Sequence, residues 1–164
     1  MGKHQVFLCL GGNLGDRAEI FRETTERLER QVGALKKASP RYETPPWGFE
    51  SELPFWNQVL LLETGLQPEQ VLDEVQLIEN YFGRQRQPGK YLSRKMDIDI
   101  LLYDRLIRST PELTIPHPLM AVRRFVLQPL ADIAPRLVHP VTGQTVAEML
   151  AACTDPAVIK RCCS

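Results

Sequence analysis

Apolar residues at helical spacing alternate along this chain with apolar runs typical of strands, and this order constrains the fold more than any other feature. Residues 20–32 and 68–82 each place apolar side chains along one side of a helix. Strands or extended segments are predicted at residues 5–10, 35–44, 55–66 and 96–104. The order β-α-β-β-α-β predicts an α+β, ferredoxin-like fold, in which helices pack on a mostly antiparallel sheet.

The C-terminal part of the chain is predicted to add two shorter helices. The first ends at Pro135, and the second begins near Thr145. No repeat or linker divides the 164 residues, so we expect one domain spanning residues 1–164, with a cysteine-rich tail at residues 153–164. The cysteines are Cys9, Cys153, Cys162 and Cys163. They form no CxxC pair, which gives a zinc site little support, and we expect reduced thiols.

Charge and hydropathy limit the partners of the chain. Twenty basic and twenty acidic residues cancel, so no broad basic surface for nucleic acid or membrane is expected. No apolar run approaches the roughly 18 residues of a membrane span. The N-terminal apolar run is also too short for a secretory signal. We expect a cytoplasmic monomer that binds neither nucleic acid nor membrane.

The stretch RKMDIDILLY, residues 94–103, carries two aspartates in an apolar run. Side chains alternate along a strand, so Asp97 and Asp99 share one face, about 6.6 Å apart along it. Neighbouring carboxylates repel unless a cation or a shared proton relieves them, and this spacing suits hard cations bridged by phosphate oxygens. A solvated strand face is the plain alternative for a lone D-x-D motif. The basic segment before the strand favours the metal site.

That segment, GRQRQPGKYLSRK at residues 83–95, is polar and lacks any acidic residue. Its cations are Arg84, Arg86, Lys90, Arg94 and Lys95. Arginines bind phosphate oxygens in pairs of hydrogen bonds, and they accompany metal-holding carboxylates in phosphoryl transfer. We expect a mobile loop that becomes ordered over a phosphate ligand and excludes water. No GxxxxGK[ST] motif occurs, and GGNLGD at residues 11–16 predicts a tight strand-to-helix turn.

A third constellation suits a flat heteroaromatic ligand. Phe55 and Asn57 share one face of a predicted strand, so an aromatic ring stands beside an amide with donors and an acceptor. The preceding TPPWG, residues 44–48, is stiffened by two prolines and would hold its remaining backbone groups in a fixed array. Simple packing of the aromatic ring in the core is the alternative interpretation.

Two further residues have two interpretations each. Glu79 lies at the margin of the second helical stripe, where a carboxylate needs a donor partner. A structural ion pair with a loop arginine and a ligand contact are equally supported. His117 lies between Pro116 and Pro118, which restrict its backbone. This arrangement fits a positioned ligand contact and also an ordinary turn.

Six motifs together resemble one family. They are LGGNLGDR, YETPPWG, FWN, IENYFGRQR, RKMDIDILLY and IPHPLMAVRRFVLQPLADIAP. Their order and spacing, from about residue 5 to residue 150, are similar to those of the 6-hydroxymethyl-7,8-dihydropterin pyrophosphokinase family. The resemblance implies an ATP-dependent diphosphotransferase of folate biosynthesis. Such an enzyme transfers pyrophosphate from ATP to the hydroxymethyl group of the pterin and releases AMP.

The resemblance also implies residue roles. Asp97 and Asp99 would hold two Mg²⁺ ions on the ATP phosphates, with Arg84 and Arg94 as further catalytic residues. Phe55 and Phe125 would enclose the pterin ring. The pterin edge would be read at Thr44, Pro46, Trp47, Gly48 and Asn57. The nucleotide contacts implied are Glu79, Arg86, Tyr91, Ile100, Thr114, His117 and Arg123.

The chain departs from the family pattern at three places. Leu92-Ser93 stands where a Gly-Pro-like pair is usual, Tyr91 where tryptophan is frequent, and Glu112 where a basic residue is frequent. These departures bear on loop closure and nucleotide affinity, and they leave the metal and pterin residues intact. Two other functions stay open from the residues alone. One is a non-catalytic metal or nucleotide sensor, and the other is a two-metal nuclease, which the zero net charge disfavours.

Overall fold

The computed structural model describes residues 3–44, 54–83 and 95–162. In chain order the larger elements are β1 (His4–Gly12), α1 (Arg17–Gln31), β2 (Gly33–Ala38), β3 (Tyr42–Thr44), β4 (Phe55–Thr64), α2 (Pro68–Tyr81), β5 (Asp97–Tyr103), α3 (Arg124–Ile133) and α4 (Val146–Ala152). The short elements are β6 (Arg108–Ser109), β7 (Thr114–Ile115), the 3-10 turn η1 (Met120–Val122) and β8 (Lys160–Arg161).

The main sheet is antiparallel throughout. Its strands run in the order β5-β1-β4-β3-β8. Strands β3 and β2 pair with the same edge of β4, β3 with its first residues and β2 with its last. Strands β6 and β7 form a separate two-stranded ribbon. The prediction of an α+β fold with a mostly antiparallel sheet is therefore confirmed.

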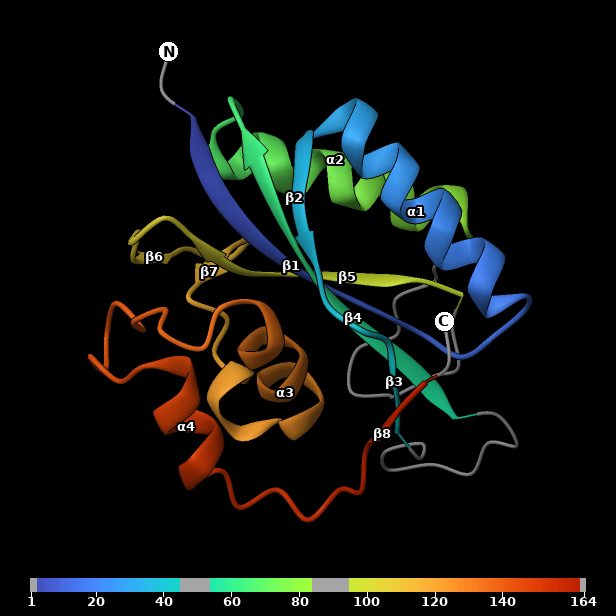
Figure 1. The fold of residues 1–164 in the computed structure, drawn as a ribbon. Helices are drawn as coiled ribbons and strands as arrows, with labels where there is room; N and C mark the ends of the chain where they lie inside the picture. The colour runs from blue at the N-terminus through green and yellow to red at the C-terminus, as the bar shows by residue number, and fades with distance from the viewer. Residues whose placement is uncertain (1–2, 45–53, 84–94, 163–164) are drawn as a thin grey trace.

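The helices cover the two faces of the sheet as two layers. Helices α1 and α2 lie on one face, and α3 and α4 lie on the other (Figure 1). Each layer has its own apolar core: Val6, Leu8 and Leu10 of β1 point toward the first pair of helices, while Phe7 and Cys9 point toward the second. Because both sides of β1 are covered, its sequence is an unbroken apolar run instead of an alternating one.

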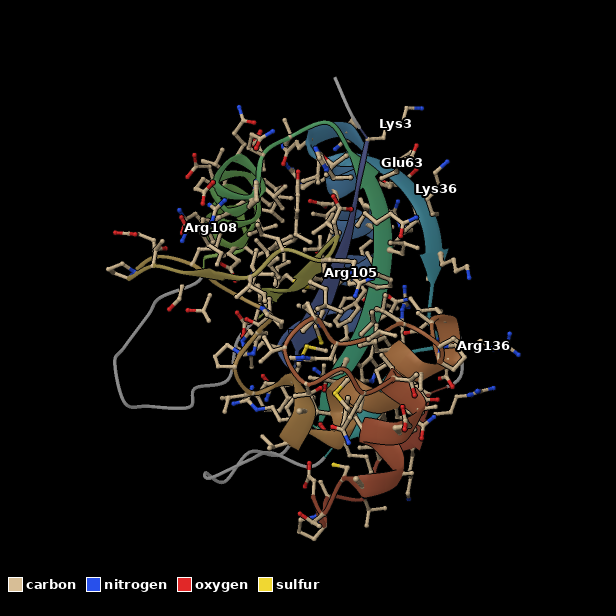
Figure 2. All side chains as sticks on the ribbon, turned by 90° about the vertical axis from the view of Figure 1, so that its left-hand side faces the viewer. Lys3, Lys36, Glu63, Arg105, Arg108 and Arg136 are labelled. Carbon is tan, nitrogen blue, oxygen red and sulfur yellow. The ribbon has the colours of Figure 1, made fainter. Side chains whose placement is uncertain are left out.

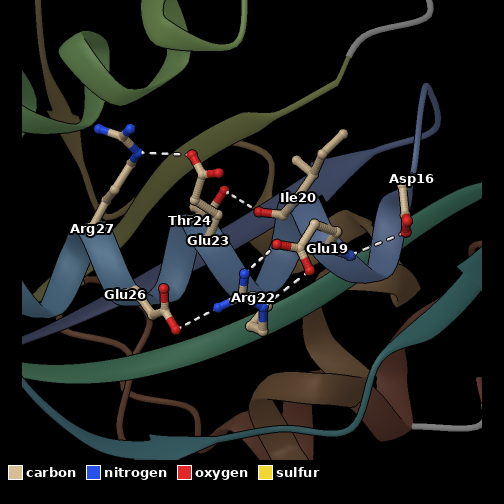
Figure 3. A network of polar contacts seen from close by, with 8 residues as sticks. All are labelled: Asp16, Glu19, Ile20, Arg22, Glu23, Thr24, Glu26 and Arg27. Atoms are coloured by element: carbon tan, nitrogen blue, oxygen red, sulfur yellow. Dashed lines mark hydrogen bonds and ion pairs between the residues drawn. The ribbon is translucent and has the colours of Figure 1, made fainter.

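Helix α1 starts where the glycine turn after β1 ends. Gly15 has a φ of 73°, a left-handed conformation that glycine adopts without a Cβ clash. Asp16 then caps the helix, since its carboxylate accepts the Glu19 N–H at 3.2 Å. On the exposed side, Arg22 pairs with both Glu19 and Glu26 (Figure 3). Each such exposed pair contributes only about 0.3–0.5 kcal/mol, so packing and capping set the position of this helix.

Charged side chains lie on the outside of both layers, where they link neighbouring elements (Figure 2). Glu63 of β4 has Lys3 at 3.5 Å and Lys36 at 3.8 Å, and Arg108 of β6 pairs with Glu69 of α2. Among the helices that the structure describes, none has the length and apolarity needed to cross a membrane.

Candidate active site

Strand register brings three polar or small residues into one row across the sheet. Asp97 of β5 is paired with Gly11 of β1, and Gly11 is paired with Asn57 of β4. Asp99 is paired with Cys9 in the next row on the same face. Since neighbouring strands lie about 4.8 Å apart, Asp97 and Asn57 are separated by about 10 Å across the backbone of Gly11. The face predicted to carry both aspartates therefore also carries Asn57.

Gly11 gives the Asn57 side chain its space. A Cβ atom at residue 11 would come within 2.9 Å of Asn57 Nδ2. On the other side of the amide, the Thr44 hydroxyl donates to Asn57 Oδ1 at 3.4 Å. Both Thr44 and Asn57 are buried, at 6% and 7% exposure, so the amide is held between β3 and β1. No local pattern in the sequence singles out Gly11, because its role depends on the pairing of β1 with β4.

His117 is docked onto β5 beside Asp99. Its backbone N–H donates to the Leu101 carbonyl at 2.9 Å, and its Nδ1 accepts the Leu119 N–H at 3.2 Å. Burial lowers the pKa of His117, the Arg123 charge lowers it further, and Asp97 acts in the opposite direction. The imidazole is therefore neutral near pH 7, with its proton on Nε2, which lies 3.9 Å from Asp99 Oδ2. Placed in this way, His117 can donate a hydrogen bond from Nε2 toward the carboxylate face.

Arg123 stands at the start of α3, within the electrostatic reach of the same face. Its guanidinium carbon is 5.5 Å from the centre of the Phe125 ring. Burial raises the pKa of the Cys9 thiol, the charges of Asp99 and Asp97 raise it further, and Arg123 partly offsets them. Cys9 thus stays a protonated, buried thiol beside Asp99 and is not a nucleophile.

Glu79 has a structural contact within the described residues. It lies in the last turn of α2, is 2% exposed, and its Oε2 accepts the Ile98 N–H at 2.9 Å. This hydrogen bond ties α2 to β5 between the two aspartates. The alternative partner weighed from the sequence, an arginine of the basic segment at residues 83–95, falls on residues 84–94 outside the described part of the chain.

Ile100 and Thr114 lie at the edge of β5 that faces away from β1. The Ile100 side chain is 5% exposed and packs in the core on the α1 and α2 side, away from the aspartates. The Ile98 N–H points away from β1, since it reaches Glu79, and strand alternation turns the main chain of Ile100 the same way. Thr114 is exposed on β7, which lies against β5. Any ligand contact of Ile100 would therefore use its main chain.

The two predicted pterin-stacking residues come from opposite sides of this region. Phe55 of β4 is paired with Thr44 of β3 and lies on the same face as Asn57. Phe125 is half-buried in the first turn of α3, the helix that covers this face. The other predicted site residues lie outside the described residues: Arg84, Arg86, Arg94, Tyr91, Pro46, Trp47 and Gly48.

Arg17 supports Phe55 from the opposite face of the sheet. Its Nη1 donates to the Pro54 carbonyl at 2.9 Å, and its guanidinium lies 4.6 Å from the Trp56 ring centre. Trp56 in turn donates from its indole N–H to Glu43 at 2.9 Å. Arg17 thereby contacts both neighbours of Phe55 in the sequence, Pro54 and Trp56. This contact could not be predicted from the sequence, although Arg17 belongs to the LGGNLGDR motif.

The carboxylate pair has the donor set of a shared magnesium site. Among residues 3–44, 54–83 and 95–162, no group of three or more His, Cys, Asp or Glu side chains could hold a metal ion. Mg²⁺ typically takes only one or two protein carboxylates and completes its shell with substrate phosphates and water. Asp97 and Asp99 are partly exposed and share a face, so they fit such a site when a phosphate ligand is present.

Comparison with known proteins agrees with this chemistry. Residues 7–135 match the family of 7,8-dihydro-6-hydroxymethylpterin-pyrophosphokinase. The 2-amino-4-hydroxy-6-hydroxymethyldihydropteridine pyrophosphokinase of Porphyromonas gingivalis is 46% identical over 138 residues, covering 82% of this chain and 93% of that protein. The Bacillus subtilis protein of the same name is 37% identical over 139 residues, covering 84% and 83%.

Larger proteins contain a similar unit. The folic acid synthesis protein fol1 of Pneumocystis carinii is 40% identical over 150 residues, which are 92% of this chain and 20% of that protein. The wild-type HPPK-DHPS of Plasmodium falciparum, solved with pteroate, superposes with a TM-score of 0.74 at 17% identity, covering 92% of this chain and 42% of that chain. The latter likeness establishes the fold alone, and this chain spans under half of that solved protein.

Proposed function

The chain belongs to the 7,8-dihydro-6-hydroxymethylpterin-pyrophosphokinase family, and from this premise we propose how its residues bind the substrates and support the reaction. The protein is an ATP-dependent diphosphotransferase of folate biosynthesis. It transfers pyrophosphate from ATP to the hydroxymethyl group of 6-hydroxymethyl-7,8-dihydropterin, giving AMP and the pterin diphosphate.

One observation carries the assignment of substrates to sides of the site: the row formed by Asp97, Gly11 and Asn57. At the β4 end of the row, the buried amide of Asn57 and the Phe55 ring offer an edge and a face to a flat, polar heterocycle. At the β5 end, the carboxylates lie beside His117, which is within the electrostatic reach of Arg123, and they suit a metal-bound polyphosphate. The pterin is therefore assigned to the β4 side and ATP to the β5 side.

Magnesium would be held by Asp97 and Asp99 together with phosphate oxygens, and we propose two ions. Bound there, Mg²⁺ supplies charge neutralisation and Lewis acidity at the phosphates. Arg123 adds positive charge from the start of α3, and Arg84 and Arg94 are proposed to add theirs from the basic segment. The remaining nucleotide contacts proposed are Glu79, Arg86, Tyr91, Ile100, Thr114 and His117.

In the reaction, the hydroxymethyl oxygen attacks the β-phosphorus of ATP in line, and the bond from that phosphorus to the bridging oxygen of AMP breaks. The Asn57 amide and the Phe55 ring orient the pterin so that this oxygen faces the phosphates. His117 cannot take the hydroxyl proton easily, because its Nδ1 lone pair already accepts the Leu119 N–H. We propose that positioning and charge neutralisation suffice without a dedicated protein base, and that the hydroxyl proton passes to a phosphate oxygen as the new P–O bond forms and is then released to water.

The direct test is an assay of the purified protein with ATP, Mg²⁺ and the hydroxymethyl pterin. We expect AMP and the pterin diphosphate to accumulate in equal amounts. AMP formed without the pterin product, or no AMP at all, would contradict the assignment. Binding of both ligands without turnover would instead support the non-catalytic sensor.

Removing either stacking ring should weaken pterin binding selectively. We expect Phe55→Ala and Phe125→Ala each to raise the pterin Kd by about tenfold or more, since stacking contributes about 0.5–1.5 kcal/mol beyond the lost contact area. Affinity for an ATP analogue should stay nearly unchanged. Calorimetric titration of each ligand separately measures both, with Phe55→Tyr and Phe125→Tyr as controls that keep the ring. Equal losses for the two ligands would indicate general damage to the core.

A methyl group added at Gly11 should lower the affinity for the pterin and leave the affinity for ATP unchanged. The new Cβ would stand 2.9 Å from Asn57 Nδ2, so the amide must move from its place between Thr44 and β1. We expect Gly11→Ala to raise the pterin Kd by about tenfold, the scale of one hydrogen bond whose buried partner is left unsatisfied. Gly65→Ala is the matched control, because a Cβ there meets nothing within 4 Å. Unchanged pterin affinity in Gly11→Ala would argue against Asn57 as the edge reader.

We further propose that the protein acts as a cytoplasmic monomer, with residues 1–164 forming one domain. The basic segment is proposed to close over bound ATP and Mg²⁺ and exclude water, so that the pterin hydroxyl receives the pyrophosphoryl group. Leu92-Ser93, Tyr91 and Glu112 are the residues at which this chain would differ from its relatives in closure and nucleotide affinity.

A further inference from the structure

The C-terminal tail runs back from α4 toward the site and contacts two elements there, helix α3 and strand β3. After α4 it crosses the start of α3, and it then adds β8 to the sheet beside β3 (Figure 1). This tail lies beyond residues 7–135, which are the part of the chain that matches the family.

Asp155 of the tail caps helix α3 from outside. The residue in the cap position of α3, Arg123, makes no side-chain cap hydrogen bond. Instead Asp155 Oδ2 accepts the Arg124 N–H, the first of the helix, at 3.0 Å. Its Oδ1 accepts the Ala157 N–H at 2.9 Å, so the tail itself holds the carboxylate in place. A carboxylate at this position satisfies a helix-end donor and also interacts favourably with the helix dipole.

Arg124 returns the contact. Its Nη2 donates to the Cys153 carbonyl at 3.0 Å, and its Nε donates to the Asp155 carbonyl at 3.3 Å. The guanidinium thus donates hydrogen bonds to two backbone carbonyls of the tail, and the backbone N–H of the same residue donates to the Asp155 side chain. The tail and the first turn of α3 are joined in both directions.

The other end of α3 is tied to the same tail. Asp132 in the last turn of α3 accepts a hydrogen bond from the Tyr42 hydroxyl, and Arg161 of β8 lies 4.0 Å from the same carboxylate. Tyr42 is paired with Arg161 on one side and with Asn57 on the other. The tail therefore spans from the start of α3 to the strand beside the Asn57 amide.

We propose that Asp155 is a positioning residue for pterin binding: it holds the first turn of α3, and with it Phe125, at the pterin side of the site. This inference rests on the proposed stacking role of Phe125. Phe125 is the second residue of α3, so its ring direction depends on whether the first turn is formed. Because the turn is already formed in the free protein, no binding free energy is lost in ordering Phe125 when the pterin binds.

The test uses the full chain with Asp155→Ala. We expect hydrogen exchange of the amides at residues 124–127 to accelerate in the free protein, and the KM for the pterin to rise about five- to tenfold, the scale of one lost helix cap. The kcat should change less than about twofold, because Asp97 and Asp99 on β5 are untouched. Asp155→Asn keeps one acceptor oxygen for the two N–H groups that the carboxylate binds, and it should restore both values in part. Thr154→Ala, a neighbouring exposed residue, is the matched control.

Arg124→Ala is the second variant, because it removes both guanidinium contacts and keeps the capped N–H. It should change exchange and KM in the same direction as Asp155→Ala. An unchanged pterin KM in both variants would overturn the positioning role, as would unchanged exchange at residues 124–127. If Phe125→Ala itself leaves pterin affinity intact, the stacking role fails and the positioning role fails with it. If Phe125→Ala raises the pterin KM while Asp155→Ala and Arg124→Ala leave it unchanged, only the positioning role is overturned.

Discussion

Asp97→Ala and Asp99→Ala are each expected to lower turnover by at least about a thousandfold while the protein stays folded. The two carboxylates share one strand face and are the acids there that suit the Mg²⁺ bound with ATP. Without either of them, negative charge on the phosphates and on the departing AMP would be poorly neutralised. Assays at saturating Mg²⁺ and ATP measure the loss.

Stability separates this loss from unfolding. Both carboxylates are partly exposed, and removing one also relieves repulsion from the other. The free energy of unfolding should therefore fall by no more than about 1 kcal/mol. Asp73→Ala, an exposed aspartate on α2, is the control for a change of one charge. Near-normal turnover in Asp97→Ala or Asp99→Ala would refute their assignment as metal ligands.

Glu79→Ala is expected to lower the free energy of unfolding by about 2–3 kcal/mol, because it leaves the buried Ile98 N–H without its charged acceptor. For a chain of this size the melting temperature should fall by about 4–12 °C. Turnover should fall as well, since Ile98 lies between the two aspartates and its hydrogen bond to α2 steadies that part of β5. Denaturant unfolding, followed by circular dichroism, measures the first effect.

Glu79→Gln is the matched control, because its amide oxygen can still accept the Ile98 N–H. We expect it to retain most of the stability lost in Glu79→Ala. A side chain that only contacted nucleotide would behave differently: both variants would raise the KM for ATP and leave unfolding unchanged. That pattern would show that the hydrogen bond to Ile98 contributes little to the fold.

The sequence predicted the helices, including the short α4 after its cap at Thr145, and the long strands, but not the two-residue strands. Helices α1 and α2 and strands β1, β4 and β5 follow from spacing that extends over several residues. The extended segment at residues 35–44 instead forms parts of two strands, β2 and β3, with Ser39, Pro40 and Arg41 between them. Ser39 Oγ accepts the Val59 N–H at 2.9 Å, and Pro40 has no N–H to offer, so the ladder is interrupted there. Two-residue strands such as β6, β7 and β8 carry no periodic signal.

The candidate site shows the same division between local and long-range information. The shared face of Asp97 and Asp99 is a property of one strand and could be predicted from it. The meeting of Gly11 with Asn57 depends on the register between β1 and β4, which no local pattern states. The side of β5 to which Ile100 points follows from the same alternation, and it limits that residue to main-chain contacts. The cap supplied by Asp155 comes from 31 residues away in the sequence, so no pattern near α3 predicts it.

Strand β8 has a consequence for solubility as well as for binding. The outer side of β3 would otherwise present unpaired N–H and C=O groups, a template on which another chain could add a strand. Pairing of Lys160 with Glu43 and of Arg161 with Tyr42 fills that side. The strand that becomes outermost is two residues long and carries two exposed cations, a combination that discourages further strand addition. The tail thus protects the sheet from edge-to-edge aggregation.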